Sequence, residues 1–101
     1  MSDVLSETEC HHLYQAWHNF ETVVKSLSIS ETKELLLLGC SDVLEALNSP
    51  PVYSVVIWAI TCDVNSIIRN SHFELGLEDV LRQMNQAVIL VCYPGIEESL
   101  N

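Results

Sequence analysis

A chain of 101 residues, 49% hydrophobic and 18% charged, predicts one folded domain over residues 1–101 with a core of its own. Its 14 Asp and Glu outnumber its four Lys and Arg, so its net charge is −10. This balance argues against binding to nucleic acid or to an anionic membrane, because both need clustered cations. An acidic surface instead favours a basic protein partner, although the same charge can serve solubility alone.

The sequence predicts an intracellular protein with reduced thiols. The first residues do not show the basic start and apolar run of a signal peptide, so none is expected. No apolar run reaches the roughly 20 residues of a membrane-spanning helix. The four cysteines lie 30, 22 and 30 residues apart, at Cys10, Cys40, Cys62 and Cys92. This spacing lacks the close pairs of zinc knuckles and redox dithiols, so we expect mostly buried, unpaired cysteines.

The first predicted element is a helix from Glu7 to about Ser26. Ser6 and Glu9 have the spacing of a capping box, in which each side chain binds the backbone N–H of the other residue. Apolar residues then recur at steps of four, three, four and three: Leu13, Trp17, Phe20, Val24 and Leu27. This spacing predicts one apolar face that packs on the rest of the domain.

Three apolar runs are predicted to be buried strands, at residues 35–38, 51–63 and 86–93. The run 51–63 is the longest and is rich in β-branched residues, which favours a central strand covered on both faces. Four leucines that stop at Gly39 favour a strand followed by a turn. The run 86–93 ends at Pro94 and Gly95, a dipeptide typical of turns.

Helices are predicted between these strands. Residues 41–48 begin with N-capping residues and end at a proline pair. Apolar residues of a second helix lie on one face, namely Phe73, Leu77, Val80, Leu81 and Met84, and this helix would include Gly76. Alternating helices and strands predict an α/β fold, a three-layer αβα sandwich with a small mixed sheet and helices on both faces.

Several short motifs occur in a characteristic order over residues 39–100. They are Gly39, Leu47-Asn48, Pro51, Val55-Val56, Asp63, His72-Phe73, Pro94-Gly95 and Leu100. In this order and spacing the chain resembles the growth-arrest-and-DNA-damage-inducible (GADD) stress proteins, which have the αβα fold of a ribosomal-protein-like superfamily. The strongly acidic loop that GADD proteins carry after the Val-Val strand is reduced here to residues 63–66.

The resemblance implies a non-enzymatic adaptor of the nucleus and cytoplasm, without a cofactor. It would bind and regulate a stress-signalling MAP kinase kinase kinase or cell-cycle proteins, and it would form a homodimer. The partner-binding residues expected from it are Asp63, Glu74, Glu78 and Asp79. The residues expected to mediate self-association are Val43, Leu44, Leu47 and Leu77.

Other functions were weighed against this adaptor. Cys10, His11, His12 and His18 cluster in the sequence, but no second pair of ligands accompanies them, so no metal site is expected. A catalytic pair of Cys62 and His72 would need a cation to lower the thiol pKa, and an acidic chain does the opposite. RNA binding is disfavoured because the predicted strand-to-helix loops carry no cation. A structural subunit that assembles through an apolar helix face remains the main alternative.

Overall fold

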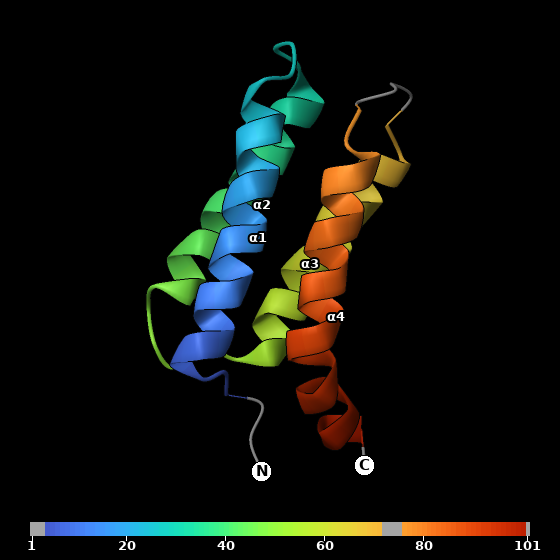
Figure 1. Ribbon diagram of the computed structural model, residues 1–101. Helices are drawn as coiled ribbons and strands as arrows, with labels where there is room; N and C mark the ends of the chain where they lie inside the picture. Colours follow the sequence, from blue (N-terminus) through green and yellow to red (C-terminus); the bar gives the residue numbers. More distant parts are fainter. Residues whose placement is uncertain (1–3, 72–75, 101) are drawn as a thin grey trace.

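The computed structural model describes residues 4–71 and 76–100, with side chains described as far as residue 97. It contains four helices, α1 (Glu7–Lys25), α2 (Glu31–Leu47), α3 (Ser54–Arg69) and α4 (Glu78–Leu100). Each helix packs against the next, and α4 also packs against α1 (Figure 1). Consecutive helices run in opposite directions, which makes an up-down-up-down bundle.

The predicted αβα sandwich is wrong. The described residues contain no strand and no sheet, and their single β-type pairing is an isolated antiparallel bridge between Val4 and Tyr53. The three runs predicted as strands are helical: residues 35–38 lie in α2, most of 51–63 lies in α3, and 86–93 lies in α4.

The central run is helical because only one side of it is buried. The buried residues of α3 recur at steps of three, four and three, at Ser54, Ile57, Thr61 and Val64. Between them, Val55 and Val56 are 51% and 42% exposed, so the run is not covered on both faces. The preference of β-branched residues for strands is weak enough for this packing to override it.

Gly39 marks a close contact between helices and not the end of a strand. It lies inside α2, where an added Cβ would come within 2.6 Å of the Cγ2 atom of Val64 on α3. The helix begins instead at Glu31, after the N-cap residue Ser30, whose side-chain oxygen accepts a hydrogen bond from the backbone N–H of Lys33 at 3.1 Å. The absence of a side chain at Gly39 therefore allows α2 and α3 to approach closely.

The glycine and proline near α4 also differ from the prediction. Gly76 precedes the helix with a φ of 67°, a backbone conformation that glycine adopts without strain. Pro94 and Gly95 do not turn the chain, because α4 continues to Leu100. Pro94 has no N–H to donate to the Leu90 carbonyl, but the buried neighbours Val91 and Cys92 keep the helix on the core.

The first helix is confirmed. Ser6 accepts from the Glu9 N–H at 3.1 Å, and the Glu9 carboxylate accepts from the Ser6 N–H at 2.8 Å, which completes the capping box. The apolar stripe of α1 is fully buried at Leu13, Trp17, Phe20 and Val24. Together with buried stripes from the other three helices, it forms one continuous core.

Two polar contacts tie helices together. The Lys33 ammonium donates to the carbonyl oxygens of Lys25 and Leu27 at 2.9 and 2.8 Å, at the end of α1 where carbonyls lack helical partners. Asn65 of α3 and Asn85 of α4 exchange two hydrogen bonds of 2.9 and 2.8 Å between their side-chain amides. These contacts fix the positions of α1 against α2 and of α3 against α4.

Candidate functional site

The outward side of α2 carries a stripe of carboxylates around an exposed leucine. Its members recur at steps of three, four, four and three, at Glu31, Glu34, Leu38, Asp42 and Glu45. This stripe lies opposite the buried stripe of the same helix, Leu36, Cys40, Val43 and Leu47. Leu38 is an apolar residue, but 61% of it is exposed. Acidic residues precede and follow it along the stripe.

Helix α3 extends this stripe with one carboxylate and one apolar side chain. Successive residues lie about 100° apart around a helix, so Asp63 and Asn65 flank Val64 on opposite sides. Asn65 contacts α4 through Asn85, and Asp63 therefore lies on the side of α3 nearer α2. Val56, two turns before Asp63, shares that side. The acidic face is defined here as Glu31, Glu34, Leu35, Leu38, Asp42, Glu45, Val56 and Asp63.

The carboxylates of the acidic face have no cationic partner among the described residues. The two ion pairs between described residues are Glu21–Lys25 at 3.5 Å and Asp79–Arg82 at 2.8 Å, and both lie outside this face. Lys33, the single cation of α2, is engaged with the carbonyls at the end of α1. The acidic face therefore combines an uncompensated negative charge with exposed apolar side chains.

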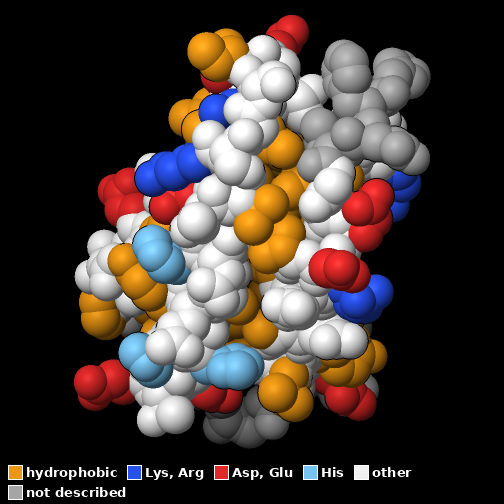
Figure 2. All heavy atoms as spheres, turned by 45° about the horizontal axis from the view of Figure 1, so that its top comes forward, with side chains coloured by type: hydrophobic (Ala, Val, Ile, Leu, Met, Phe, Trp, Pro, Cys, Tyr) orange, Lys and Arg blue, Asp and Glu red, His pale blue; other side chains and the backbone are white. Residues whose placement is uncertain are grey.

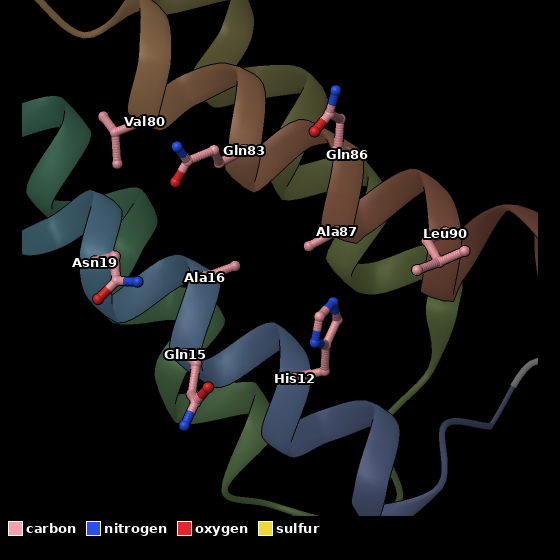
Figure 3. A pocket seen from close by; sticks show the side chains of 9 residues that line it. All are labelled: His12, Gln15, Ala16, Asn19, Val80, Gln83, Gln86, Ala87 and Leu90. Atoms are coloured by element: carbon pink, nitrogen blue, oxygen red, sulfur yellow. The ribbon is translucent and has the colours of Figure 1, made fainter.

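A second surface lies between α1 and α4, and it has the opposite character. A groove of about 390 Å³ is lined by nine residues, here called the uncharged groove: His12, Gln15, Ala16, Asn19, Val80, Gln83, Gln86, Ala87 and Leu90. Figure 3 shows Ala16 and Ala87 facing each other across the groove, with side-chain amides along its borders. Figure 2 shows a line of hydrophobic side chains on this side of the molecule.

The small side chains of Ala16 and Ala87 leave the middle of the groove open, and its borders lack carboxylates and Lys or Arg. Leu90, at the right-hand end of the groove in Figure 3, is 71% exposed. The side-chain amides of Asn19, Gln83 and Gln86 make no hydrogen bond to other described residues. Since an amide both donates and accepts, these groups can pair with any polar partner, including another amide.

The structure describes three of the four acids expected to bind a partner, and it places them in two parts of the molecule. Asp63 belongs to the acidic face. Glu78 and Asp79 are exposed in the first turn of α4, where Asp79 accepts a hydrogen bond from Arg82. Glu74 lies outside the described residues. Asp63 is therefore on the α2 side of α3, away from the two acids of α4.

The residues expected to mediate self-association lie inside the bundle. Val43, Leu47 and Leu77 are 0%, 6% and 2% exposed, and Leu44 is half-buried against the same core. A second copy could not contact the three buried side chains while the bundle stays folded.

The cysteines and histidines do not assemble into a reactive centre within the described residues. Burial raises the pKa of Cys40 and of Cys92 to about 12, with a smaller contribution from Glu21 and Glu9, so both thiols stay protonated at neutral pH. The His18 ring stacks on Tyr14 at a centroid distance of 6.1 Å. No set of three or more His, Cys, Asp or Glu side chains in this part of the chain could hold a metal ion.

Four acids of the acidic face were missed from the sequence, namely Glu31, Glu34, Asp42 and Glu45. Their spacing complements that of the buried stripe of α2, so a helical reading of residues 31–47 would have found them. Interpreting 35–38 as a strand divided that segment and hid the pattern.

Comparison with known proteins gives no relative. No protein-family model, no curated protein and no solved structure matches the chain. The resemblance to GADD proteins thus stays a prediction, and the αβα fold that it implied is not the fold of this chain. Among the described residues, none of the helices has the length and apolar character required to cross a bilayer.

Proposed function

We propose that the protein is a small non-enzymatic adaptor whose acidic face binds a basic, amphipathic helix of a protein partner. The observation that carries this proposal is Leu38, 61% exposed at the centre of a stripe of carboxylates that have no cationic partner in the described part of the chain. A partner helix with leucine-like residues on one side and Lys or Arg beside them would complement both features.

The two features would contribute differently to binding. Exposed apolar side chains such as Leu38 and Val56 gain roughly 25 cal/mol for each Å² that the partner covers. The carboxylates steer a basic segment into place and select against acidic ones, and this contribution weakens as salt screens it. Binding should therefore fall as ionic strength rises but should not vanish, because the apolar contribution persists.

Affinity capture with charge-matched variants tests this proposal. One variant carries Glu34→Lys, Asp42→Lys and Asp63→Lys on the acidic face. The control carries Glu78→Lys, Asp79→Lys and Glu97→Lys on α4. Each reversal adds two charges, so both variants change from −10 to −4. Circular dichroism of both variants verifies that they fold.

We expect mass spectrometry to find a basic protein that the wild type and the α4 control capture from cell lysate and that the acidic-face variant does not. Capture that is lost only in the α4 control would contradict the proposal and favour the site expected from Glu78 and Asp79. Equal loss in both variants would show that net charge, and not a defined face, governs binding.

A stress-signalling protein kinase or a cell-cycle protein, as the resemblance implies, remains a prediction for the identity of the partner. Such a partner would place the adaptor inside the cell, in the nucleus and cytoplasm. The kinase domain or regulatory segment in question would need a basic amphipathic helix to fit the acidic face.

A second candidate function is a structural subunit that assembles with copies of itself, and the uncharged groove favours it. Copies of a chain with a net charge of −10 repel each other wherever acids meet. The uncharged groove avoids this repulsion, and its amides can pair with those of a second copy. Sedimentation of Leu90→Glu against the matched Leu38→Glu variant tests it: only Leu90→Glu should reduce self-association. Unchanged sedimentation of Leu90→Glu would exclude this groove as the interface.

A further inference from the structure

A second hollow lies between α3 and α4, separate from the acidic face and from the uncharged groove. It has a volume of about 340 Å³, at the lower end of the range typical of ligand sites. One end is apolar, lined by Trp58, Val88 and Ile89, and the other end carries Arg69. Trp58 and Arg69 are 11 residues apart on α3, so these ends are about 16 Å apart along the helix axis.

Arg69 is the described cation whose charge is least engaged. Lys25 and Arg82 pair with carboxylates, and Lys33 binds two backbone carbonyls. The Arg69 guanidinium donates to the Ser66 hydroxyl at 3.1 Å, and no described carboxylate lies within ion-pair distance of it. In a chain with 14 acids and four cations, a guanidinium that lines a hollow and has no ion pair with a described carboxylate is suited to an anion.

The polar groups in the middle of the hollow are already satisfied. The amides of Asn65 and Asn85 bind each other, and Asn65 also donates to the Thr61 carbonyl at 2.8 Å. The Thr61 hydroxyl donates to the Ile57 carbonyl at 2.7 Å. A ligand would therefore find a cationic end and an apolar end, with few unpaired polar groups between them.

The apolar end is partly open to solvent. Ile89 is 53% exposed, and the ring of Trp58 lies 5.9 Å from the 44% exposed ring of Tyr93. An unbranched hydrocarbon lying along these side chains would cover apolar surface on the protein and on itself. If this hydrocarbon carried a carboxylate at one end, it would be long enough for the carboxylate to reach Arg69.

We propose that this hollow binds a medium-chain carboxylate, with the carboxylate on Arg69 and the hydrocarbon over Trp58, Val88 and Ile89. Arg69 forms a bidentate pair with the carboxylate, which a neutral head group cannot replace. Binding here does not depend on the acidic face, because Arg69 and Asp63 lie on different sides of α3.

Cys62 provides a direct readout. Its thiol lines the hollow and is exposed, whereas Cys10 is half-buried on α1 and Cys40 and Cys92 are buried. Alkylation of the folded protein by iodoacetamide, followed at each cysteine by peptide mass spectrometry, measures how accessible Cys62 is. Cys10 serves as the internal reference because it does not line this hollow.

We expect decanoate, below its micelle concentration, to slow alkylation of Cys62 several-fold and to leave Cys10 unchanged. Decanol should protect much less. The exposed Arg69→Gln variant should be alkylated at the basal rate and lose protection by decanoate, while Arg69→Lys should keep part of it. Equal protection by decanol and decanoate, or full protection in Arg69→Gln, would overturn the assignment of Arg69, and no protection by decanoate would overturn the site itself.

Discussion

The acidic face and the uncharged groove are built in the same way but suit different partners. Each lies along two neighbouring helices whose buried residues help to fill one shared core. The acidic face presents carboxylates and exposed apolar side chains of α2 and α3, whereas the uncharged groove presents amides, alanines and a histidine of α1 and α4. The bundle thus supplies the shape, and the charge at solvent-exposed positions determines which partner each side can accept.

The largest expected effect concerns the core that both surfaces share. Burial raises the pKa of Cys40 and Cys92 from the ordinary 9.0 to about 12 in the folded chain. Above about pH 9 the unfolded chain releases these protons while the folded chain retains them, so stability falls as pH rises from there towards 12. Urea unfolding at neutral pH and at about pH 10 should show this loss.

The Cys40→Ala, Cys92→Ala double variant isolates the thiols from tyrosines and lysines that also titrate in this range. It should be less stable at neutral pH but lose less stability on the rise to alkaline pH. An equal loss in the variant and the wild type would show that these thiols do not cause the decline.

The next effect concerns the close contact between α2 and α3, the two helices that carry the acidic face. Gly39→Ala places a Cβ against Val64 and separates α2 from α3, which carry the acidic face. Overpacking costs about 1–3 kcal/mol, which outweighs the gain of about 1 kcal/mol from replacing a helical glycine. Thermal unfolding should show a net loss, and Val64→Ala in the same chain should recover part of it. A stabilised single variant would mean that the two helices are not in tight contact here.

A smaller effect compares an amide that is hydrogen-bonded to a neighbouring helix with an amide that has no hydrogen-bond partner among the described residues. Asn85→Ala leaves Asn65 without its partner on α4, and stability should fall by about 1–2 kcal/mol. Gln83→Ala, on the border of the uncharged groove, should change stability by less than about 0.5 kcal/mol. Denaturant unfolding measures the free energy of unfolding of both variants. An equal loss of stability in the two would contradict the claim that the Gln83 amide does not contribute to the fold.

The last comparison concerns binding affinity and a single leucine on each surface. Leu38→Ala should weaken binding of the basic partner by about 1–2 kcal/mol, as expected for loss of an apolar anchor. Leu90→Ala, an equal truncation at the uncharged groove, should leave that affinity unchanged. Isothermal titration of the captured partner against both variants makes the comparison, and weakening by Leu90→Ala alone would move the binding site to the groove.

The sequence predicted the parts of the fold in which apolar and polar residues alternate with helical spacing. The capping box of Ser6 and Glu9 and the stripe containing Trp17 and Phe20 were both found in this way. The second predicted helix was found in part: Val80, Leu81 and Met84 lie in α4 and pack on the core, whereas Leu77 is buried just before the helix begins and Phe73 lies outside the described residues.

The remaining helices could not be recognised from local sequence. In residues 51–63 and 86–93 the exposed positions are apolar as well, so Val55, Val56, Ile89 and Leu90 conceal the helical period. Whether such a residue is buried depends on neighbouring helices, which local propensity does not describe. Three of these exposed residues belong to candidate sites, namely Val56 to the acidic face, Leu90 to the uncharged groove and Ile89 to the hollow between α3 and α4.

The central claim is that the acidic face, and no other acidic part of the molecule, binds the basic partner. Titration of the partner's basic segment, labelled for fluorescence anisotropy, against the two charge-matched variants tests it most directly. Reversal of Glu34, Asp42 and Asp63 should weaken binding at least about tenfold, which is about 1.4 kcal/mol, and reversal of Glu78, Asp79 and Glu97 should change it by less than about threefold. Equal affinities for the two variants, or a greater loss in the second, would contradict the claim.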